Sequence, residues 1–203
     1  MHRHPVSGEL SPSGGSWSWA RRWWWCLVLS SACGWAGEVF TKYNLHVQDR
    51  LDKAGQHEYT ASCANWTDPG NGHLVIPANT GVEILDSTAK VIKLKVVADG
   101  KIIKLEFNRK WMMGMTADAY AALITAPVAA PVTAKSAVDR QGIQEGKALV
   151  GMTKAGVMTA LGYPAAQRTP NPETNKTWIY WTNRFVSMAV EFDEAGLVKS
   201  VSR

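Results

Sequence analysis

The stretch GMTKAGVMTALGYP, residues Gly151 to Pro164, indicates how the C-terminal part of this 203-residue chain folds. Thr153 is placed as a helix N-cap, because a threonine hydroxyl can accept a backbone N–H of the first turn. Met152 and Val157 flank this cap at the spacing of a hydrophobic staple. Apolar residues at i, i+3 and i+4 then share one helical face, and the glycine before the final proline is typical of a helix end. We therefore predict a helix over residues 153–161.

Three short strands are expected after this helix and a proline-containing loop, over residues 177–182, 185–192 and 197–201. Short turns join them, so the strands must pair antiparallel as a meander. One face of such a sheet needs an apolar cover, and the preceding helix can supply it. The pattern therefore predicts a small α+β domain over residues 142–203.

An earlier stretch, GMTADAYAALITAP from Gly114 to Pro127, repeats the same helix start. Thr116 is the expected N-cap, and Met115 and Tyr120 have the staple spacing. A duplicated domain would repeat the strands as well, and this stretch is not followed by strands. The two segments are therefore explained by a shared way of starting a helix, without a shared function. We predict a short helix within residues 111–127 that closes the β module preceding it.

A linker rich in alanine and proline is expected over residues 128–141. Proline lacks a backbone N–H and fixes φ, so the front half of this segment is poorly suited to a helix or a central strand. The back half lacks proline. A further short helix from about Thr133 to Lys147, with Thr133 as its start signal, is therefore expected to begin there.

The segment ahead of the first repeat, residues 37–110, predicts a small all-β module. Asp99-Gly100 lies between two alternating runs, which is a strong hairpin signal. Pro77 interrupts an earlier run, which makes that run an edge strand or a bend. We expect about five short strands between Val39 and Asn108.

The passage HLVIPANTGVEIL, His73 to Leu85, resembles a motif of bacterial SH3-like barrels, over about residues 39–108. This resemblance implies a small barrel that could grip the cell wall. A generic β-meander is the alternative interpretation of the same residues. The fold class predicted for the whole chain is α+β: a small SH3-like β-barrel or meander, then one or more helices packed on a three-stranded antiparallel sheet.

Residues 1–36 have the pattern of an export signal. Arg21 and Arg22 form a basic flank, and Trp23 to Ala36 is an apolar run of 14 residues. A membrane-spanning helix takes about 20 residues, so this run is too short to span but suits a signal-peptide core. Small residues that suit a cleavage site follow at Gly34 and Ala36. A retained N-terminal anchor is the alternative.

The cysteines give one further prediction in this segment. Cys33 ends LSSAC, which resembles a bacterial lipobox but has Ser30 where leucine is usual, so lipidation of Cys33 is a candidate modification. Cleavage of the signal after the small residues would leave Cys63 as the remaining thiol. No intrachain disulfide framework is then expected.

Composition narrows the function classes. A hydrophobic content of 46% with 19% charged residues indicates a packed core. The formal net charge is +5, but no cluster of Lys and Arg is interleaved with aromatic residues, so no nucleic acid partner is expected. His46, His57, His73 and Cys63 lack the close pairing of a zinc site. We find no nucleophile–base pair or phosphate-binding loop, and we predict no cofactor, no metal and no enzymatic activity.

The C-terminal block resembles the SmpA/OmlA family of bacterial envelope proteins, which includes the small lipoprotein of the outer-membrane β-barrel assembly machine. The resemblance covers about residues 140–203 and implies a small α+β fold, an envelope location and a role in outer-membrane protein assembly. The β module ahead of it is not part of that small lipoprotein. The matching residues are Gly151, Met152, Thr153, Val157, Leu161, Gly162, Pro164, Trp178, Tyr180, Val190, Phe192, Asp193, Gly196 and Val198.

A candidate binding surface combines aromatic and basic side chains, the residue types that dominate binding hot spots. In the run WIYW, Trp178 and Tyr180 should point to one sheet face and Trp181 to the other. One pair packs under the helix. The other is covered by the N-terminal module or the proline-rich loop, or else it meets a partner. The candidate residues are Tyr163, Pro164, Arg168, Trp181, Arg184 and Phe185.

These observations predict a non-enzymatic, exported protein of the bacterial periplasm or the periplasmic face of the outer membrane. Its expected partner is another envelope protein, such as a component of outer-membrane assembly. The alternative is a peptidoglycan-binding protein that acts through the SH3-like module. Contact with the membrane is expected only through a lipid on Cys33 or an uncleaved signal.

Overall fold

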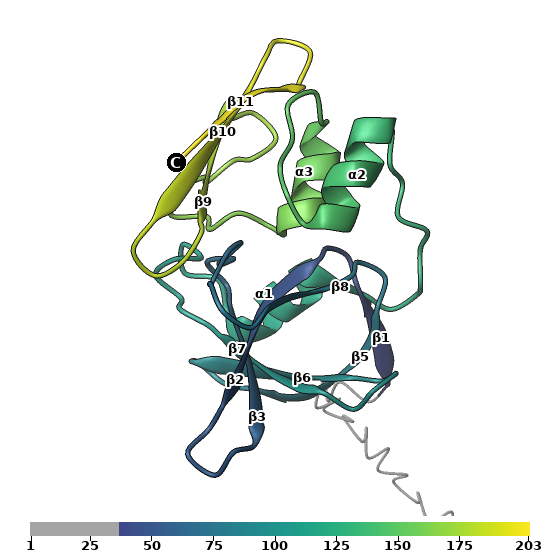
Figure 1. The fold of residues 1–203 in the computed structure, drawn as a ribbon, viewed down its shortest axis with the longest axis vertical. Helices are drawn as coiled ribbons and strands as arrows, with labels where there is room; N and C mark the ends of the chain where they lie inside the picture. The colour runs from purple at the N-terminus through teal and green to yellow at the C-terminus, as the bar shows by residue number, and fades with distance from the viewer. Residues whose placement is uncertain (1–36) are drawn as a thin grey trace, which may run out of the picture. The chain divides into compact units, whose positions relative to one another are not determined.

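The computed structural model describes residues 37–203, so the predicted export signal and Cys33 lie outside the described residues. The described chain forms two sheets and three short helices (Figure 1). The larger sheet has eight strands in the order β4-β2-β3-β7-β6-β5-β1-β8. Their bounds are β1 Glu38–Thr41, β2 Leu45–Leu51, β3 His57–Ser62, β4 His73–Ile76, β5 Gly81–Ser87, β6 Val91–Val96, β7 Ile102–Glu106 and β8 Thr125–Ala126.

The predicted fold class, with an SH3-like barrel ahead of helices packed on a sheet, is wrong. The structure is mostly sheet: a curled eight-stranded sheet, a separate three-stranded sheet and three short helices. Two pairings account for the difference. Strand β3 pairs parallel with β7, and β8, which follows the first helix, pairs antiparallel with β1. Both join segments far apart in the chain, so the local patterns that predicted a five-stranded meander do not contain them.

Several local expectations for this sheet are confirmed. The Asp99-Gly100 turn joins β6 and β7, which pair antiparallel. Pro77 directly follows β4, which is one of the two edge strands of the large sheet. Inward-facing side chains such as Val47, Ile92 and Leu105 form an apolar core.

Helix α1, Ala117–Ile124, lies beside the curled sheet (Figure 1). Its Tyr120 and Ile124 pack in this core, and Met115 packs beside them. Thr116 is its N-cap, as predicted. The helix is followed by β8, so the segment of the first repeat adds a strand to the sheet as well as a helix. Burial of the apolar helix face therefore also positions the last strand of the large sheet.

The C-terminal part contains two helices and a three-stranded antiparallel sheet in the order β11-β10-β9. Helix α2, Ala137–Glu145, begins after Ser136 rather than Thr133, inside the segment predicted as a linker. Helix α3 spans Lys154–Leu161 with Thr153 as its N-cap, as predicted, and lies beside α2 (Figure 1). No helix of residues 37–203 has the length and apolar character needed to span a membrane. The strands are β9 Thr177–Trp181, β10 Ser187–Phe192 and β11 Val198–Ser202.

A second core lies between α3 and this sheet. Val157 and Leu161 of the helix share it with Trp178 and Tyr180 of β9. The Trp178 Nε1–H donates to the Pro172 carbonyl at 2.9 Å, and the Tyr180 hydroxyl donates to the Gly162 carbonyl at 3.0 Å. The buried polar atoms of both aromatic residues are thereby satisfied, which removes most of the cost of burying them.

Strand β2 and Asn44 directly before it carry a row of buried polar side chains, two of which bond to the C-terminal helices. Leu45 and Val47 point into the core of the large sheet, whereas Asn44, His46 and Gln48 alternate with them on the other face. Asn44 Nδ2 donates to the Ile143 carbonyl at 2.7 Å and to the Ala160 carbonyl at 3.3 Å. These carbonyls lie near the C-termini of α2 and α3, where backbone acceptors lack partners within the helix. We call this row the polar seam.

Candidate functional site

The site forms where a loop of the N-terminal half lies along the outer edge of β9. The Thr67 N–H donates to the Trp181 carbonyl at 2.9 Å, and the Asp68 N–H donates to the Thr182 carbonyl at 2.9 Å. Trp66 and Trp181 are partners in a short parallel bridge. Residues in register on neighbouring strands point to the same side of a sheet, so the two indole rings lie on one face. That face is opposite to the one that Trp178 and Tyr180 use in the core.

Two arginines lie over these indole rings. The Arg168 guanidinium carbon is 5.9 Å from the Trp181 ring centroid, and that of Arg184 is 5.6 Å from the Trp66 ring centroid. Such contacts contribute about 0.5–1 kcal/mol at exposed sites. Neither arginine forms an ion pair with a carboxylate of residues 37–203. Cation–π contact therefore holds both guanidinium groups near the indole rings, and no carboxylate of residues 37–203 occupies their N–H groups.

Phe185 projects from the turn between β9 and β10 and is 86% exposed. The Asn183 side chain fixes this turn, because its Oδ1 accepts the N–H groups of Phe185 at 2.9 Å and Val186 at 3.1 Å. Val186 beside it is 42% exposed. The hydrogen-bonded turn therefore exposes two apolar side chains to solvent next to Arg184. We call Trp66, Arg168, Trp181, Arg184 and Phe185 the aromatic–arginine cluster.

The structure brings together four of the six residues predicted from the sequence: Arg168, Trp181, Arg184 and Phe185. Pro164 is buried, and Tyr163 is half-buried against the core of the large sheet. Burial, and to a smaller extent the Glu173 carboxylate, raises the pKa of Tyr163. The Tyr163 carbonyl accepts a hydrogen bond from Asn65 Nδ2. Tyr163 and Pro164 therefore support the loop that carries Arg168 and are not part of the exposed cluster.

Trp66 is the member of the cluster that the sequence did not predict. It lies in the turn-rich loop NWTDPGNGH, and its pairing with Trp181 joins segments far apart in the chain. An aromatic side chain within such a polar loop was the available signal. The neighbouring residues of this loop cover one side of Trp181, and Arg168 covers its ring, so Trp181 is half-buried.

A second group of polar side chains lies in the polar seam. His46 Nδ1 and His73 Nε2 are 3.0 Å apart, and His46 Nε2 is 3.0 Å from the Ala160 carbonyl. A carbonyl only accepts, so His46 Nε2 carries a proton, its Nδ1 accepts, and His73 Nε2 donates. Burial lowers the pKa of His46 to about 4, and burial also lowers the pKa of His73.

His73 borders a cleft of about 380 Å³, but the side chains around it do not form a catalytic set. Asp68 and Arg203 line the cleft and bind each other at 3.2 Å. Nothing in the spacing of the two histidines in the sequence indicated that they would meet. Within residues 37–203, neither of them is hydrogen-bonded to a hydroxyl or thiol that could act as a nucleophile.

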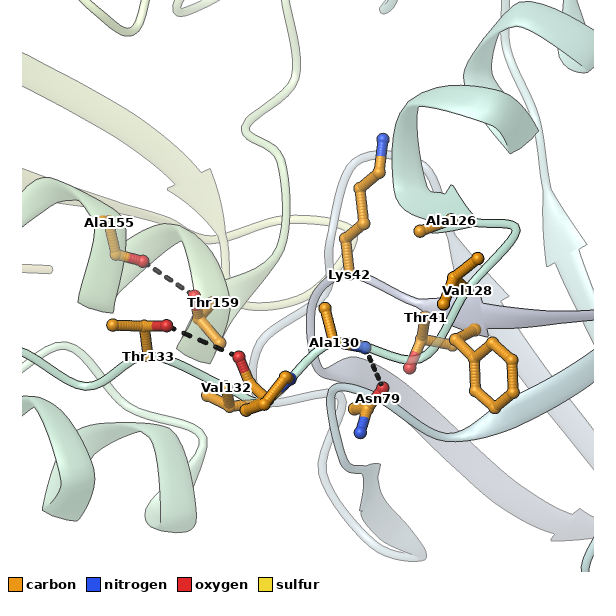
Figure 2. A pocket seen from close by; sticks show the side chains of 12 residues that line it. Thr41, Lys42, Asn79, Ala126, Val128, Ala130, Val132, Thr133, Ala155 and Thr159 are labelled. Carbon is orange, nitrogen blue, oxygen red and sulfur yellow. Dashed lines mark hydrogen bonds between the residues drawn. The ribbon is translucent and has the colours of Figure 1, made fainter.

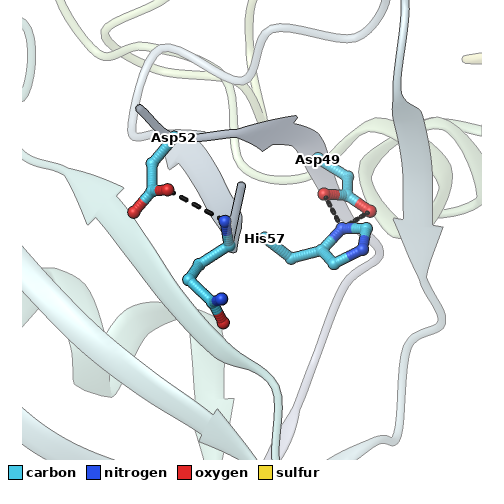
Figure 3. A network of polar contacts seen from close by, with 4 residues as sticks. Asp49, Asp52 and His57 are labelled. Atoms are coloured by element: carbon cyan, nitrogen blue, oxygen red, sulfur yellow. Dashed lines mark hydrogen bonds and ion pairs between the residues drawn. The ribbon is translucent and has the colours of Figure 1, made fainter. Parts of the chain in front are cut away.

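The hairpin of β2 and β3 carries an exposed histidine–aspartate pair (Figure 3). His57 Nδ1 lies 2.7 and 3.0 Å from the two carboxylate oxygens of Asp49, while Asp52 Oδ1 accepts the Gln56 N–H at 2.9 Å in the connecting turn. No hydroxyl or thiol of the described residues bonds to His57. The pair therefore has the geometry of a hairpin contact and lacks the third member of a nucleophilic triad.

A pocket of about 270 Å³ lies beside the segment that connects β8 to α2 (Figure 2). The Ala130 N–H donates to Asn79 Oδ1 at 3.0 Å at its margin, and Val128 is exposed there. Its lining is mostly small and apolar. The Lys42 ammonium donates to the Ala122 carbonyl at 3.2 Å. This pocket therefore has few polar groups that could bind a specific polar ligand.

Metal and thiol chemistry find little support in the part of the chain that the structure describes. No three side chains of His, Cys, Asp or Glu among residues 37–203 come together as a metal site. Cys63 is buried, and burial raises the pKa of its thiol to about 11. The thiolate is the reactive form, so Cys63 has the character of an inert core residue.

Comparison with protein-family models, with curated proteins and with solved structures finds no match for this chain. The geometry of the aromatic–arginine cluster and the patterns of the sequence are therefore what bear on its function.

Proposed function

We propose that this chain is a non-enzymatic protein of the bacterial cell envelope that binds another protein through its aromatic–arginine cluster. The observation that carries the proposal is Phe185, which is 86% exposed on a hydrogen-bonded turn beside two arginines in cation–π contact with tryptophan rings. An exposed phenylalanine loses water contact favourably when a partner covers it. Hydrogen bonds to the turn reduce the entropy lost on binding.

The composition of the cluster supports a protein partner. Tryptophan and arginine are the residues most often found at the energetic centre of protein interfaces, where a rim of weaker contacts excludes water from them. The guanidinium groups of Arg168 and Arg184 are already oriented, so a partner that meets them loses less side-chain entropy. Trp66 and Trp181 provide a partly exposed apolar base beneath them.

The envelope location rests on the sequence patterns. Residues 1–36 have the pattern of an export signal, and the C-terminal block resembles the SmpA/OmlA family. Many of the residues that carry this resemblance, such as Val157, Trp178, Tyr180 and Val190, lie in the second core. They bear on folding more than on partner choice, so a role in outer-membrane protein assembly is proposed from the resemblance alone.

The peptidoglycan alternative loses its structural basis. It required an SH3-like barrel over residues 39–108, and those residues belong instead to an eight-stranded sheet completed by β8. Binding to the cell wall would therefore contradict the proposal.

The test is site-specific photo-crosslinking in intact cells. A photoreactive amino acid at Phe185 should give a discrete adduct with another envelope protein, and this adduct should be lost in the double variant R168A/R184A. The matched control is the same amino acid at Val150, which is 64% exposed and lies outside the cluster, and it should give no such adduct.

Two results would contradict the proposal. One is the absence of a protein adduct at position 185 together with sedimentation of the full chain with purified sacculi. The other is recovery of the full-length, uncleaved chain in the cytoplasm, which would contradict the export prediction.

A further inference from the structure

A second exposed turn adjoins the aromatic–arginine cluster. The Gln167 N–H donates to the Trp111 carbonyl at 2.8 Å, so the loop that carries Arg168 is bonded to the segment between β7 and α1. That segment reads RKWMMG from Arg109 to Gly114. Trp111 is half-buried and packs against the core of the large sheet. The neighbouring segment therefore extends the cluster with further basic, aromatic and apolar residues.

The segment is closed by its own hydrogen bonds and presents an apolar tip. Arg109 Nε donates to the Gly114 carbonyl at 2.7 Å, and the Gly114 N–H donates to the Arg109 carbonyl at 2.9 Å. Met113 at the tip is 66% exposed and has a φ of 49°. A left-handed backbone is unfavourable for methionine and occurs mainly where the surroundings impose it. Met113 thus resembles Phe185, because each is a solvent-exposed apolar side chain on a hydrogen-bonded turn.

The basic side chains of this surface form no ion pairs within the described chain. Arg109, Lys110, Arg168 and Arg184 are all exposed, and no carboxylate of residues 37–203 pairs with them. Glu106 and Asp118 line grooves beside Arg109 without forming an ion pair with it. Elsewhere in residues 37–203, the cations that pair with a carboxylate are Lys93, Lys95, Lys101, Lys104, Lys147, Lys176 and Arg203. The exposed Arg50 and Lys53 form no ion pair in the described chain either, so the aromatic and apolar neighbours are what distinguish the four cations of this surface.

The kind of positive charge favours a protein partner over a lipid surface. Three of the four cations are arginines, and they stand among tryptophans and an exposed methionine, which is the composition enriched at protein interfaces. An anionic lipid surface attracts lysine and arginine alike through charge alone. A guanidinium held over an indole ring keeps its N–H groups available, and their planar arrangement matches a carboxylate in a two-point contact.

Resting on the proposed function, we propose that the binding surface is bipartite, with the Arg109–Gly114 turn as its second half, and that the partner presents a carboxylate-rich protein surface. Phe185 and Met113 contact apolar positions of this partner, and the four cations meet its Asp and Glu side chains. Charge complementarity favours an acidic protein surface as the partner of this site.

The first arm of the test compares charge reversals in the crosslinking experiment. The variant R109E/K110E should lower the adduct yield at position 185 about tenfold, because like charges then face each other. The control R50E/K53E reverses two exposed cations of the β2–β3 hairpin and should leave the yield unchanged. Equal thermal unfolding of the two variants excludes misfolding. A photoreactive amino acid at Met113 should capture the same protein as position 185.

The second arm tests the chemistry of the partner. The peptide crosslinked at position 113 should contain Asp or Glu, and replacing these with Lys should restore the adduct of R109E/K110E. Purified full-length protein should bind poly-L-glutamate about tenfold more weakly after R109E/K110E. If that variant instead changes only binding to phosphatidylglycerol vesicles, a lipid surface is the ligand and the inference is wrong.

The outcomes separate the two proposals. An adduct at position 185 that is unaffected by R109E/K110E, or a crosslinked peptide without acidic residues, leaves the proposed function standing and overturns the bipartite acidic site. Absence of a protein adduct at both positions overturns both.

Discussion

Helices α1 and α3 begin in the same way and are stabilised by different surroundings. Thr116 Oγ accepts the Ala119 N–H at 3.2 Å, and Thr153 Oγ accepts the Gly156 N–H at 3.0 Å. Each helix has eight residues and buries a face in one of the two cores. The comparison separates what a local start signal contributes from what the tertiary environment adds.

The third residue of each helix marks the difference. Ala119 of α1 is exposed, whereas Gly156 of α3 is buried against Asp139 of α2. The Asp139 carboxylate is fully buried and accepts the Thr153 N–H at 2.8 Å and the Thr153 hydroxyl at 3.1 Å. The N-terminus of α3 is therefore capped twice, by its own threonine and by another helix. The cap of α1 relies on its own threonine.

The last carbonyls of both helices accept hydrogen bonds from residues outside the helix. In α1, the Ala121 carbonyl accepts the hydroxyl of Thr125, a residue of the same segment, at 2.7 Å. In α3, the Ala160 carbonyl accepts from His46 and Asn44 of the polar seam. The C-terminal end of α1 is also bonded to a distant segment, because the Lys42 N–H donates to the Ile124 carbonyl at 2.8 Å. The two helices therefore differ mainly at their N-termini, where Asp139 of α2 adds to the cap of α3.

The largest effect is expected at the third helical position. An alanine Cβ at Gly156 would overlap the Asp139 carboxylate, so G156A should destabilise the protein by about 3 kcal/mol or more. The reverse change A119G in α1 should cost about 1 kcal/mol, the difference in helix propensity. Urea denaturation of both variants measures the contrast. Equal costs would mean that Asp139 moves freely and that the close packing of α2 on α3 has no energetic weight.

The polar seam should make the end of α3 sensitive to acid. The pKa of His46 is lowered to about 4 in the fold and is about 6.5 in an unfolded chain, so the unfolded state binds the proton first as the pH falls. Stability should therefore decline from about pH 6.5 to about pH 4, by about 3 kcal/mol in total.

The variant H46Q should remove the share of this acid-dependent loss that His46 carries, and unfolding measured between about pH 7 and about pH 4.5 tests it. His73, whose pKa is also lowered by burial, should leave a remainder. Asp68, Glu145, Lys147 and Arg203 line the adjoining cleft and are unchanged in the variant. The control H57Q alters the exposed histidine of the hairpin and should keep the acid loss. An identical pH profile for H46Q and the wild type would show that His46 does not carry it.

The smallest effects are expected at the caps themselves. T116A should cost about 1 kcal/mol, the usual value for an N-cap. T153A should cost about 2 kcal/mol, because the Thr153 hydroxyl also donates to the buried Asp139 carboxylate. The combination T153A/D139N should cost less than the sum of its parts. A strictly additive double variant would contradict the coupling inferred between α2 and α3.

Local patterns predicted the elements whose determinants lie close together in sequence. The caps at Thr116 and Thr153 depend on a side chain and an N–H three residues later, and the β9–β11 meander depends on short turns. The sheet order could not be predicted in this way, because the hydrophobic pattern of a strand does not show which distant strand it pairs with, as in the β3–β7 and β1–β8 pairings. The SH3-like interpretation was wrong for that reason.

The candidate site divides along the same line. Arg168, Trp181, Arg184 and Phe185 lie within one loop and hairpin and were found from composition. Trp66 joins them through a parallel bridge, and His46 meets His73 through neighbouring strands of the large sheet. Those contacts depend on the tertiary fold, because the residue types of a loop or strand do not indicate which distant residue they will contact.

The polar seam also bears on the order in which the chain can fold. Asn44 and His46 bond to carbonyls that lie 99 to 116 residues later in the sequence. During synthesis, Asn44 Nδ2 and His46 Nε2 lack these carbonyl partners until residues near Ala160 are available, and buried polar groups without partners are costly. Because contacts between distant segments form slowly, the bonding of the polar seam to α2 and α3 awaits most of the chain. The chain therefore completes its tertiary contacts late. This is compatible with the proposed export, in which the chain would cross a membrane in an extended state.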